Sequence, residues 1–254
     1  MSITLIRKSL LFLGVDKPIA YTLVGRGWSV LTGPVTLILF ASFLSPEEQG
    51  FYYTFGSVLA LNIFFELGLY LVILQFASHE KAKLQWTSQG TLTGDPIAKS
   101  RLASLAWMSL KWYGVAAFLM TATIVPIGLV FFSSYQPTAI EVTWQLPWVW
   151  VVLVTAGNLV VNPFLAVLEG CGLVAEVAFV RVGQSILGSI LLWVALLQHW
   201  GLFAAPAFYG CGLLWAASWL ALRKRILLVD LLSFRPNLAV VSWRYEIWPF
   251  QWKI

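Results

Sequence analysis

Six long apolar stretches alternate with short polar segments along the chain. They cover approximately residues 20–44, 51–77, 104–132, 148–169, 177–198 and 201–222. A helix that crosses the roughly 30 Å hydrocarbon core of a bilayer needs about 20 mostly apolar residues, and each stretch reaches that length. The pattern therefore predicts an all-α membrane protein in which residues 1–222 form a bundle of six transmembrane helices.

The composition supports this prediction. Of the 254 residues, 59% are hydrophobic and 11% are charged, whereas about 25% of residues are charged in soluble domains. So few charges cannot cover a soluble protein of this size, and the apolar surface is expected to face lipid.

The distribution of basic residues predicts the orientation. The gaps at 45–50, 133–147 and 199–201 contain no Lys or Arg, whereas basic residues precede the first span, separate spans two and three, and follow span six. Because loops rich in Lys and Arg stay in the cytoplasm, we expect the N-terminus to be cytoplasmic.

Two polar segments are expected on that same side. Residues 78–103, which contain Gly90 and Gly94, are interpreted as a helix–turn–helix extension of spans two and three. Residues 223–254 are interpreted as a linker helix on the inner membrane surface, followed by the start of a seventh span.

Motifs of soluble enzymes are missing from the sequence. It contains no GxSxG, P-loop, HExxH or CxxC pattern, and it has two histidines. We therefore expect no catalytic residue, no metal site and no cofactor. The net charge of +5 does not gather into a basic run with interleaved aromatic residues, so nucleic acid is not an expected partner.

Charged residues within the spans are the main functional candidates, because such charges cost at least roughly 2.5–3.5 kcal/mol to insert and usually face a cavity or a partner. Arg26 in span one is flanked by Gly25 and Gly27. It either faces a cavity or extends to the inner membrane surface. Glu66, near the middle of span two, either pairs with Arg26 or acts as a gating or proton-coupled carboxylate.

Lys111 in span three and Arg181 in span five lie at a similar expected depth to Arg26. If the three side chains converge, they form a basic pocket for a phosphate or pyrophosphate group. If they do not, each extends to the inner surface. Asn158 and Asn162 share one face of span four, where they either pack against a helix or line a cavity. Gln184 in span five is a weaker candidate for polar lining.

Residues 37–80 carry a resemblance to a known family. The end of span one, the turn SPEEQGFYYTF and the mid-span ELGL resemble the first helical hairpin of O-antigen-type polysaccharide-export flippases. These flippases belong to the multidrug/oligosaccharidyl-lipid/polysaccharide exporter superfamily. The six-span layout with a cytoplasmic N-terminus is also similar.

The resemblance implies a lobe of six helices around a central cavity in the bacterial inner membrane. Two such lobes would move a polyprenyl-pyrophosphate-linked oligosaccharide to the outer leaflet by alternating access. Family members have about twice as many spans, so the implied partners are this lipid-linked oligosaccharide, membrane lipid and a second six-helix lobe from the same gene or another chain. Family members also place cations in the cavity of the first lobe. Arg26 is the best match to such a cation, and Lys111 is a poorer one.

Three other functions stay open on the sequence. A cation-coupled drug or metabolite exporter of the same superfamily predicts an acidic or neutral cavity dominated by Glu66. A membrane enzyme that acts on lipid-linked sugars predicts a large outer loop with functional residues, but the longest outer gap has one charged residue, Glu141. A membrane scaffold predicts a solid bundle without a groove.

Overall fold

The computed structural model describes residues 16–134, 142–234 and 239–251, and its long elements are all helices. Their bounds are α2 (Lys17–Phe43), α3 (Pro46–Leu59), η1 (Ala60–Asn62), α4 (Ile63–Glu66), α5 (Leu69–Lys81), α6 (Pro96–Ser134), α7 (Gln145–Gly170), α8 (Val174–Leu197), η2 (Gly201–Phe203), α9 (Ala204–Arg223), α10 (Arg225–Ser233), η3 (Trp243–Ile247) and α11 (Trp248–Gln251). Five helical segments of the described chain are long and apolar enough to cross a membrane. The segment α3–α4 and the helix α5 meet at a bend, and together they form a sixth candidate if they are counted as one span. The prediction of an all-α membrane protein is confirmed at this level.

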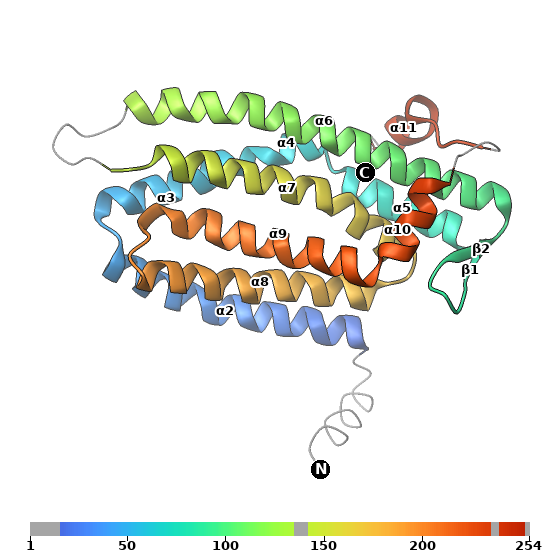
Figure 1. The fold of residues 1–254 in the computed structure, drawn as a ribbon, viewed down its shortest axis with the longest axis horizontal. Coiled ribbons are helices and arrows are strands. Elements are labelled where there is room, and N and C mark those ends of the chain that lie inside the picture. The colour runs from blue at the N-terminus through green and yellow to red at the C-terminus, as the bar shows by residue number, and fades with distance from the viewer. Residues whose placement is uncertain (1–15, 135–141, 235–238, 252–254) are drawn as a thin grey trace, which may run out of the picture.

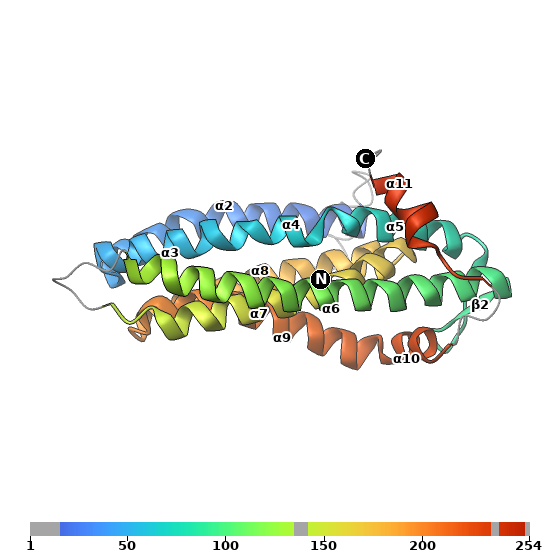
Figure 2. The same ribbon diagram turned by 90° about the horizontal axis from the view of Figure 1, so that it is seen from above.

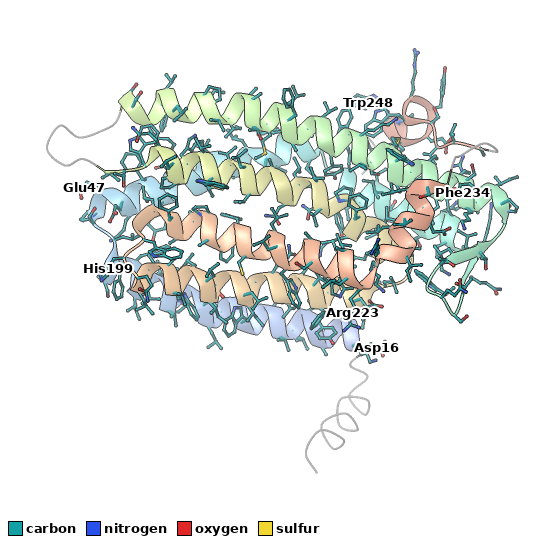
Figure 3. All side chains as sticks on the ribbon, viewed as in Figure 1. Asp16, Glu47, His199, Arg223, Phe234 and Trp248 are labelled. Carbon is teal, nitrogen blue, oxygen red and sulfur yellow. The ribbon has the colours of Figure 1, made fainter. Side chains whose placement is uncertain are left out.

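The long helices run along a common axis (Figure 1). The closest packing is between α8 and α9, α2 and α8, α6 and α7, α5 and α7, and α7 and α9. Glu47 and His199 lie at one end of the bundle, and Asp16 and Arg223 lie at the other (Figure 3). Two of the three predicted gaps without Lys or Arg therefore share one end. Which end faces the cytoplasm stays a prediction.

α2 packs chiefly against α8 and exposes most of its surface. Two indole hydrogen bonds join these helices. Trp28 Nε1 donates to Ser189 Oγ, and Trp193 Nε1 donates to Thr36 Oγ1, both at 2.9 Å. At the other polar groups of α2, Ser and Thr hydroxyls bond back to the helix's own carbonyls. α2 is therefore attached to the lobe mainly along one side.

The second predicted span is broken directly after Glu66. α3–α4 and α5 meet at an angle of 41°, and both residues between them are in the left-handed region, Leu67 at φ 52° and Gly68 at φ 68°. Glycine adopts this conformation without steric cost, whereas an ordinary residue such as leucine pays about 1–2 kcal/mol. The span expected over 51–77 therefore consists of two helical parts with a break after Glu66.

The helix–turn–helix expectation for residues 78–103 is wrong in its centre. α5 and α6 extend toward each other as expected, but β1 (Leu84–Trp86) and β2 (Leu92–Gly94) form an antiparallel hairpin between them. Gly90 and Gly94 have φ values of 80° and 145°. These glycines favour a tight hairpin over a helical turn, because few other residues adopt such backbone conformations.

Ion pairs join the segment after α9 to the parts of α5 and α6 next to the β-hairpin. Arg101 on α6 lies 2.7 Å from Glu80 of α5 and also pairs with Glu246 of η3. Lys99 lies 3.0 Å from Asp230 of α10. The predicted linker helix is present as α10. The part of the expected seventh span that the structure describes forms η3 and α11, which packs beside α5 through Phe250 and Phe76.

Candidate functional site

A groove runs between α2 and α4–α5. These helices lie on the same side of the bundle in Figure 2, while α8, α9 and α7 are drawn between them in the view of Figure 1. A cavity of about 670 Å³ lies against α2, α7 and α8, and a second cavity of about 300 Å³ lies against α4, α5, α7 and α8. Arg181 lines both cavities, so we treat them as one central groove. Its polar lining consists of Thr22, Arg26, Ser29, Glu66, Tyr70, Asn162, Glu169, Arg181, Gln184 and Ser185.

Arg181 of α8 is the centre of the polar contacts in this groove. Its guanidinium carbon lies 4.8 Å from the centre of the Tyr70 ring, and Nη2 lies 3.5 Å from Glu169 Oε2. The hydroxyl of Tyr70 donates a hydrogen bond to the same Glu169 oxygen. A guanidinium has five N–H donors. At 3.5 Å and with half of its side chain exposed, Arg181 is only loosely held by this carboxylate and can offer donors to a ligand.

Arg26 lines the larger cavity from α2, and Glu169 and Arg181 line it from α7 and α8. Its side chain is exposed and makes no ion pair within the described residues. A Cβ added to Gly25 would lie 3.2 Å from Val182 of α8, whereas one added to Gly27 would meet no described atom within 4 Å. Gly25 therefore allows α2 to pack closely on α8, and Gly27 leaves the space beside Arg26 open.

Glu66 does not pair with Arg26 in the described part of the chain. It lies at the end of α4, next to the break in span two, and lines the smaller cavity with Asn162, Arg181 and Gln184. The expected Arg26–Glu66 pair is corrected accordingly, because the cation that shares a cavity with Glu66 comes from span five. Gln184 donates to the Gly212 carbonyl of α9 at 3.2 Å. The groove thus combines two arginines with two carboxylates.

Lys111 and Asn158 are not among the lining residues of either cavity. Lys111 is exposed on α6, where its ammonium lies 5.8 Å from the Trp107 ring. Asn158 Nδ2 donates to the Val154 carbonyl and, at 3.1 Å, to the Tyr209 carbonyl of α9, which fastens α7 to α9. The three predicted cations therefore do not all converge, since Arg26 and Arg181 share a cavity and Lys111 lies elsewhere.

Glu169 and Tyr70 belong to the groove but were not predicted. Glu169 is the last residue of the apolar stretch 148–169, where a carboxylate is easily taken for the polar end of a span. Tyr70 follows the ELGL segment. Its ring has an apolar body and a polar hydroxyl, so a tyrosine in a membrane helix does not by itself indicate a binding site. The sequence could have indicated Glu169, because its carboxylate lies within the apolar stretch.

Comparison of the chain with protein-family models, with curated proteins and with solved structures gave no match. The long apolar helices define the class, a multi-pass helical membrane protein. The residues of the central groove are the basis for a narrower functional proposal.

Proposed function

We propose that this chain is one lobe of a bacterial inner-membrane flippase. In this proposal the central groove binds the pyrophosphate of a polyprenyl-linked oligosaccharide, and the lobe moves it to the outer leaflet together with a second six-helix lobe. The observation that carries the proposal is that Arg26 of α2 and Arg181 of α8 line one cavity.

The chemistry of the groove suits such a head group. Guanidinium groups bind phosphate oxygens through paired, charge-assisted hydrogen bonds. Arg181 is oriented by Tyr70 and Glu169 from α5 and α7, whereas Arg26 stands free of ion pairs in the described chain. A pyrophosphate has two phosphoryl groups and can engage both arginines. The lipid-facing surface of α2 beside the groove gives a polyprenyl chain an apolar side to lie against.

A second candidate is a cation-coupled exporter of the same superfamily. The observation that favours it is the presence of Glu66 and Glu169 in the groove, with Glu66 next to a broken helix. Transporters place ion sites at such interruptions, because unwound backbone offers carbonyl oxygens there.

Binding to the purified chain in nanodiscs separates the two candidates. Farnesyl pyrophosphate is the first probe, and its affinity is measured for the wild type, Arg26→Gln and Arg181→Gln. Hydrogen bonds to charged groups are worth about 1.5–3 kcal/mol, so each substitution should weaken binding by at least about tenfold. Lys111→Gln is the matched control, since it removes an exposed cation outside the groove and should leave the affinity unchanged.

Equal affinity for all four proteins would refute the head-group role of the two arginines. The exporter candidate predicts a different result with a second probe, tetraphenylphosphonium. Its binding should depend on sodium concentration or on pH, and Glu66→Gln should abolish that dependence while the arginine variants retain it.

A further inference from the structure

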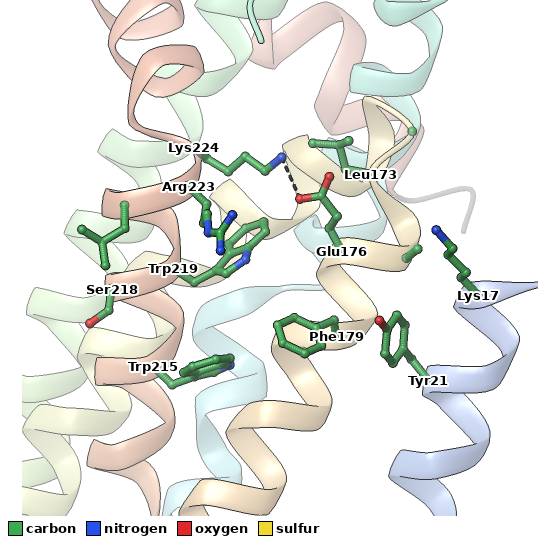
Figure 4. A pocket seen from close by; sticks show the side chains of 13 residues that line it. Lys17, Tyr21, Leu173, Glu176, Phe179, Trp215, Ser218, Trp219, Arg223 and Lys224 are labelled. Atoms are coloured by element: carbon green, nitrogen blue, oxygen red, sulfur yellow. Dashed lines mark ion pairs between the residues drawn. The ribbon is translucent and has the colours of Figure 1, made fainter. Parts of the chain in front are cut away.

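A third cavity lies beside the first turns of α2, at the end of the bundle that carries Arg223. It has a volume of about 890 Å³, and its lining comes from α2, from the start of α8 and from the last turns of α9 (Figure 4). We call it the end pocket. Its residues on α8 include Glu176 and Phe179, whereas the central groove uses Arg181 and Ser185 of that helix. The two sites therefore use different residues of both α2 and α8.

The end pocket has an excess of positive charge. Lys17 of α2, Arg223 at the end of α9 and Lys224, which follows it, line the pocket together with one carboxylate, Glu176. Lys224 Nζ lies 2.7 Å from Glu176 Oε2 and 5.4 Å from the centre of the Trp219 ring, so this pair is largely neutralised. Lys17 and Arg223 have no ion-pair partner in the part of the chain that the structure describes. Two positive charges thus remain for a ligand.

Aromatic rings form the wall of the pocket on its membrane side. Tyr21 of α2 lies 5.6 Å from Phe179 of α8, which in turn lies 5.8 Å from Trp215 of α9, both with edge-to-face geometry. The indole of Trp215 donates to the Val180 carbonyl at 3.1 Å. Figure 4 shows Tyr21, Phe179 and Trp215 on the three neighbouring helices, with Lys17 and Lys224 beyond them toward the helix ends.

This arrangement matches the chemistry of an amphiphile. Cations at the helix ends suit a phosphate group, and a row of rings about one turn deeper suits the first part of the acyl chains, since aromatic residues favour the membrane interface. The rim is open to lipid, because Leu222, which lines the pocket, is 81% exposed. Basic pockets between helices on the cytoplasmic side are typical binding sites for anionic lipid head groups.

We propose that the end pocket binds the phosphate head group of an anionic phospholipid of the inner leaflet, held by Lys17 and Arg223. A zwitterionic lipid brings no net charge to this pocket, so selectivity for an anionic lipid follows from the two unneutralised cations. This proposal does not depend on the function proposed for the central groove.

Native mass spectrometry of the full chain, titrated with phosphatidylglycerol or phosphatidylcholine in detergent, tests the proposal. The wild type should retain phosphatidylglycerol more tightly than phosphatidylcholine. The double variant K17Q/R223Q should bind phosphatidylglycerol roughly tenfold more weakly, because each juxtamembrane cation contributes to attraction of anionic lipid. The charge-matched control K111Q/R244Q removes two exposed cations outside the pocket and should bind like the wild type.

A third variant should change the affinity for phosphatidylglycerol in the opposite direction. Glu176→Gln releases Lys224 from its ion pair, so it should increase the affinity for phosphatidylglycerol. This increase cannot come from a damaged fold, which keeps the proposal testable even if K17Q/R223Q is unstable. Equal retention of both lipids, wild-type binding by K17Q/R223Q, or weaker binding by Glu176→Gln would each overturn the proposal. The proposal would also be overturned if glycerol 1-phosphate, at the same concentration as phosphatidylglycerol, displaced the lipid completely. That result would indicate a site for a free phosphate group.

Discussion

Gly170, the last residue of α7, lies close against the backbone of α5. A Cβ added there would lie 2.4 Å from the Leu74 carbonyl oxygen and 2.7 Å from the Ala77 Cβ, while ordinary contacts begin at 3.4 Å. Both obstacles are backbone or Cβ atoms and cannot rotate away. Gly170→Ala therefore requires the two helices to separate by about 1 Å. Overpacking of this kind costs about 1–3 kcal/mol, and we expect a loss of about 2 kcal/mol in the free energy of unfolding.

The separation should also reach the central groove, because Tyr70 and Glu169 lie on α5 and α7 and together orient Arg181. Gly170→Ala should therefore weaken the binding of farnesyl pyrophosphate in addition to lowering stability. Stability is measured by titration with dodecyl sulfate in mixed micelles, followed by far-ultraviolet circular dichroism.

Gly114→Ala is the matched control for this experiment. A Cβ at Gly114 in α6 would meet no described atom within 4 Å, and alanine is about 1 kcal/mol more favourable than glycine within a helix. This variant should be as stable as the wild type or slightly more stable. If Gly170→Ala and Gly114→Ala unfold at the same dodecyl sulfate fraction, the argument from close helix packing is refuted.

Two further predictions concern the ion pairs of Arg101. Arg101→Gln leaves Glu80, which is 1% exposed, without its close cation, and removing one partner of a buried pair costs about 3 kcal/mol. The same micelle titration measures this loss in the free energy of unfolding. Lys111→Gln removes an exposed cation from the same helix and should cause almost no loss. The hydrogen bond from Arg101 holds the pKa of Glu246 below its ordinary value of 4.5, so this pair should stabilise the fold above about pH 4.5 and lose that contribution as the pH falls through the lowered pKa. Thermal unfolding between pH 7 and pH 3 should show a smaller acid-induced loss for Glu246→Gln than for the wild type, and an equal loss in both proteins would contradict this assignment.

The helical architecture could be predicted from hydropathy alone. The expected stretches 148–169 and 177–198 differ from α7 and α8 by only a few residues at each end. The reason is physical: a membrane helix has to bury about 20 apolar residues in lipid, and that requirement is written directly into the local sequence. The same argument cannot detect a break such as Leu67–Gly68, because the stretch 51–77 is apolar enough on average to be taken as one span, even with Glu66 in it.

The composition of the groove was only partly predictable. Hydropathy indicates the depth of a charge but does not indicate which face of the helix meets which neighbour. Arg26 and Glu66 were expected at compatible depths, yet Arg181 of span five is the cation that shares a cavity with Glu66. The rotation of each helix about its own axis is set by packing between distant segments, such as the contact of Gly25 with α8, and a single sequence does not display those contacts.

The one-sided attachment of α2 has a mechanical consequence. Its indole hydrogen bonds to α8 involve Trp28 and Thr36, whereas its first turns meet α8 through contacts such as that of Tyr21 with Phe179 and line both sites. A shift of these turns relative to α8 would change the lining of both sites, because Lys17 and Tyr21 line the end pocket and Arg26 lines the central groove. Ligands that prefer different positions of one element must alter each other's affinity by the same factor. Binding of an anionic lipid in the end pocket would then change the affinity of the central groove for its ligand.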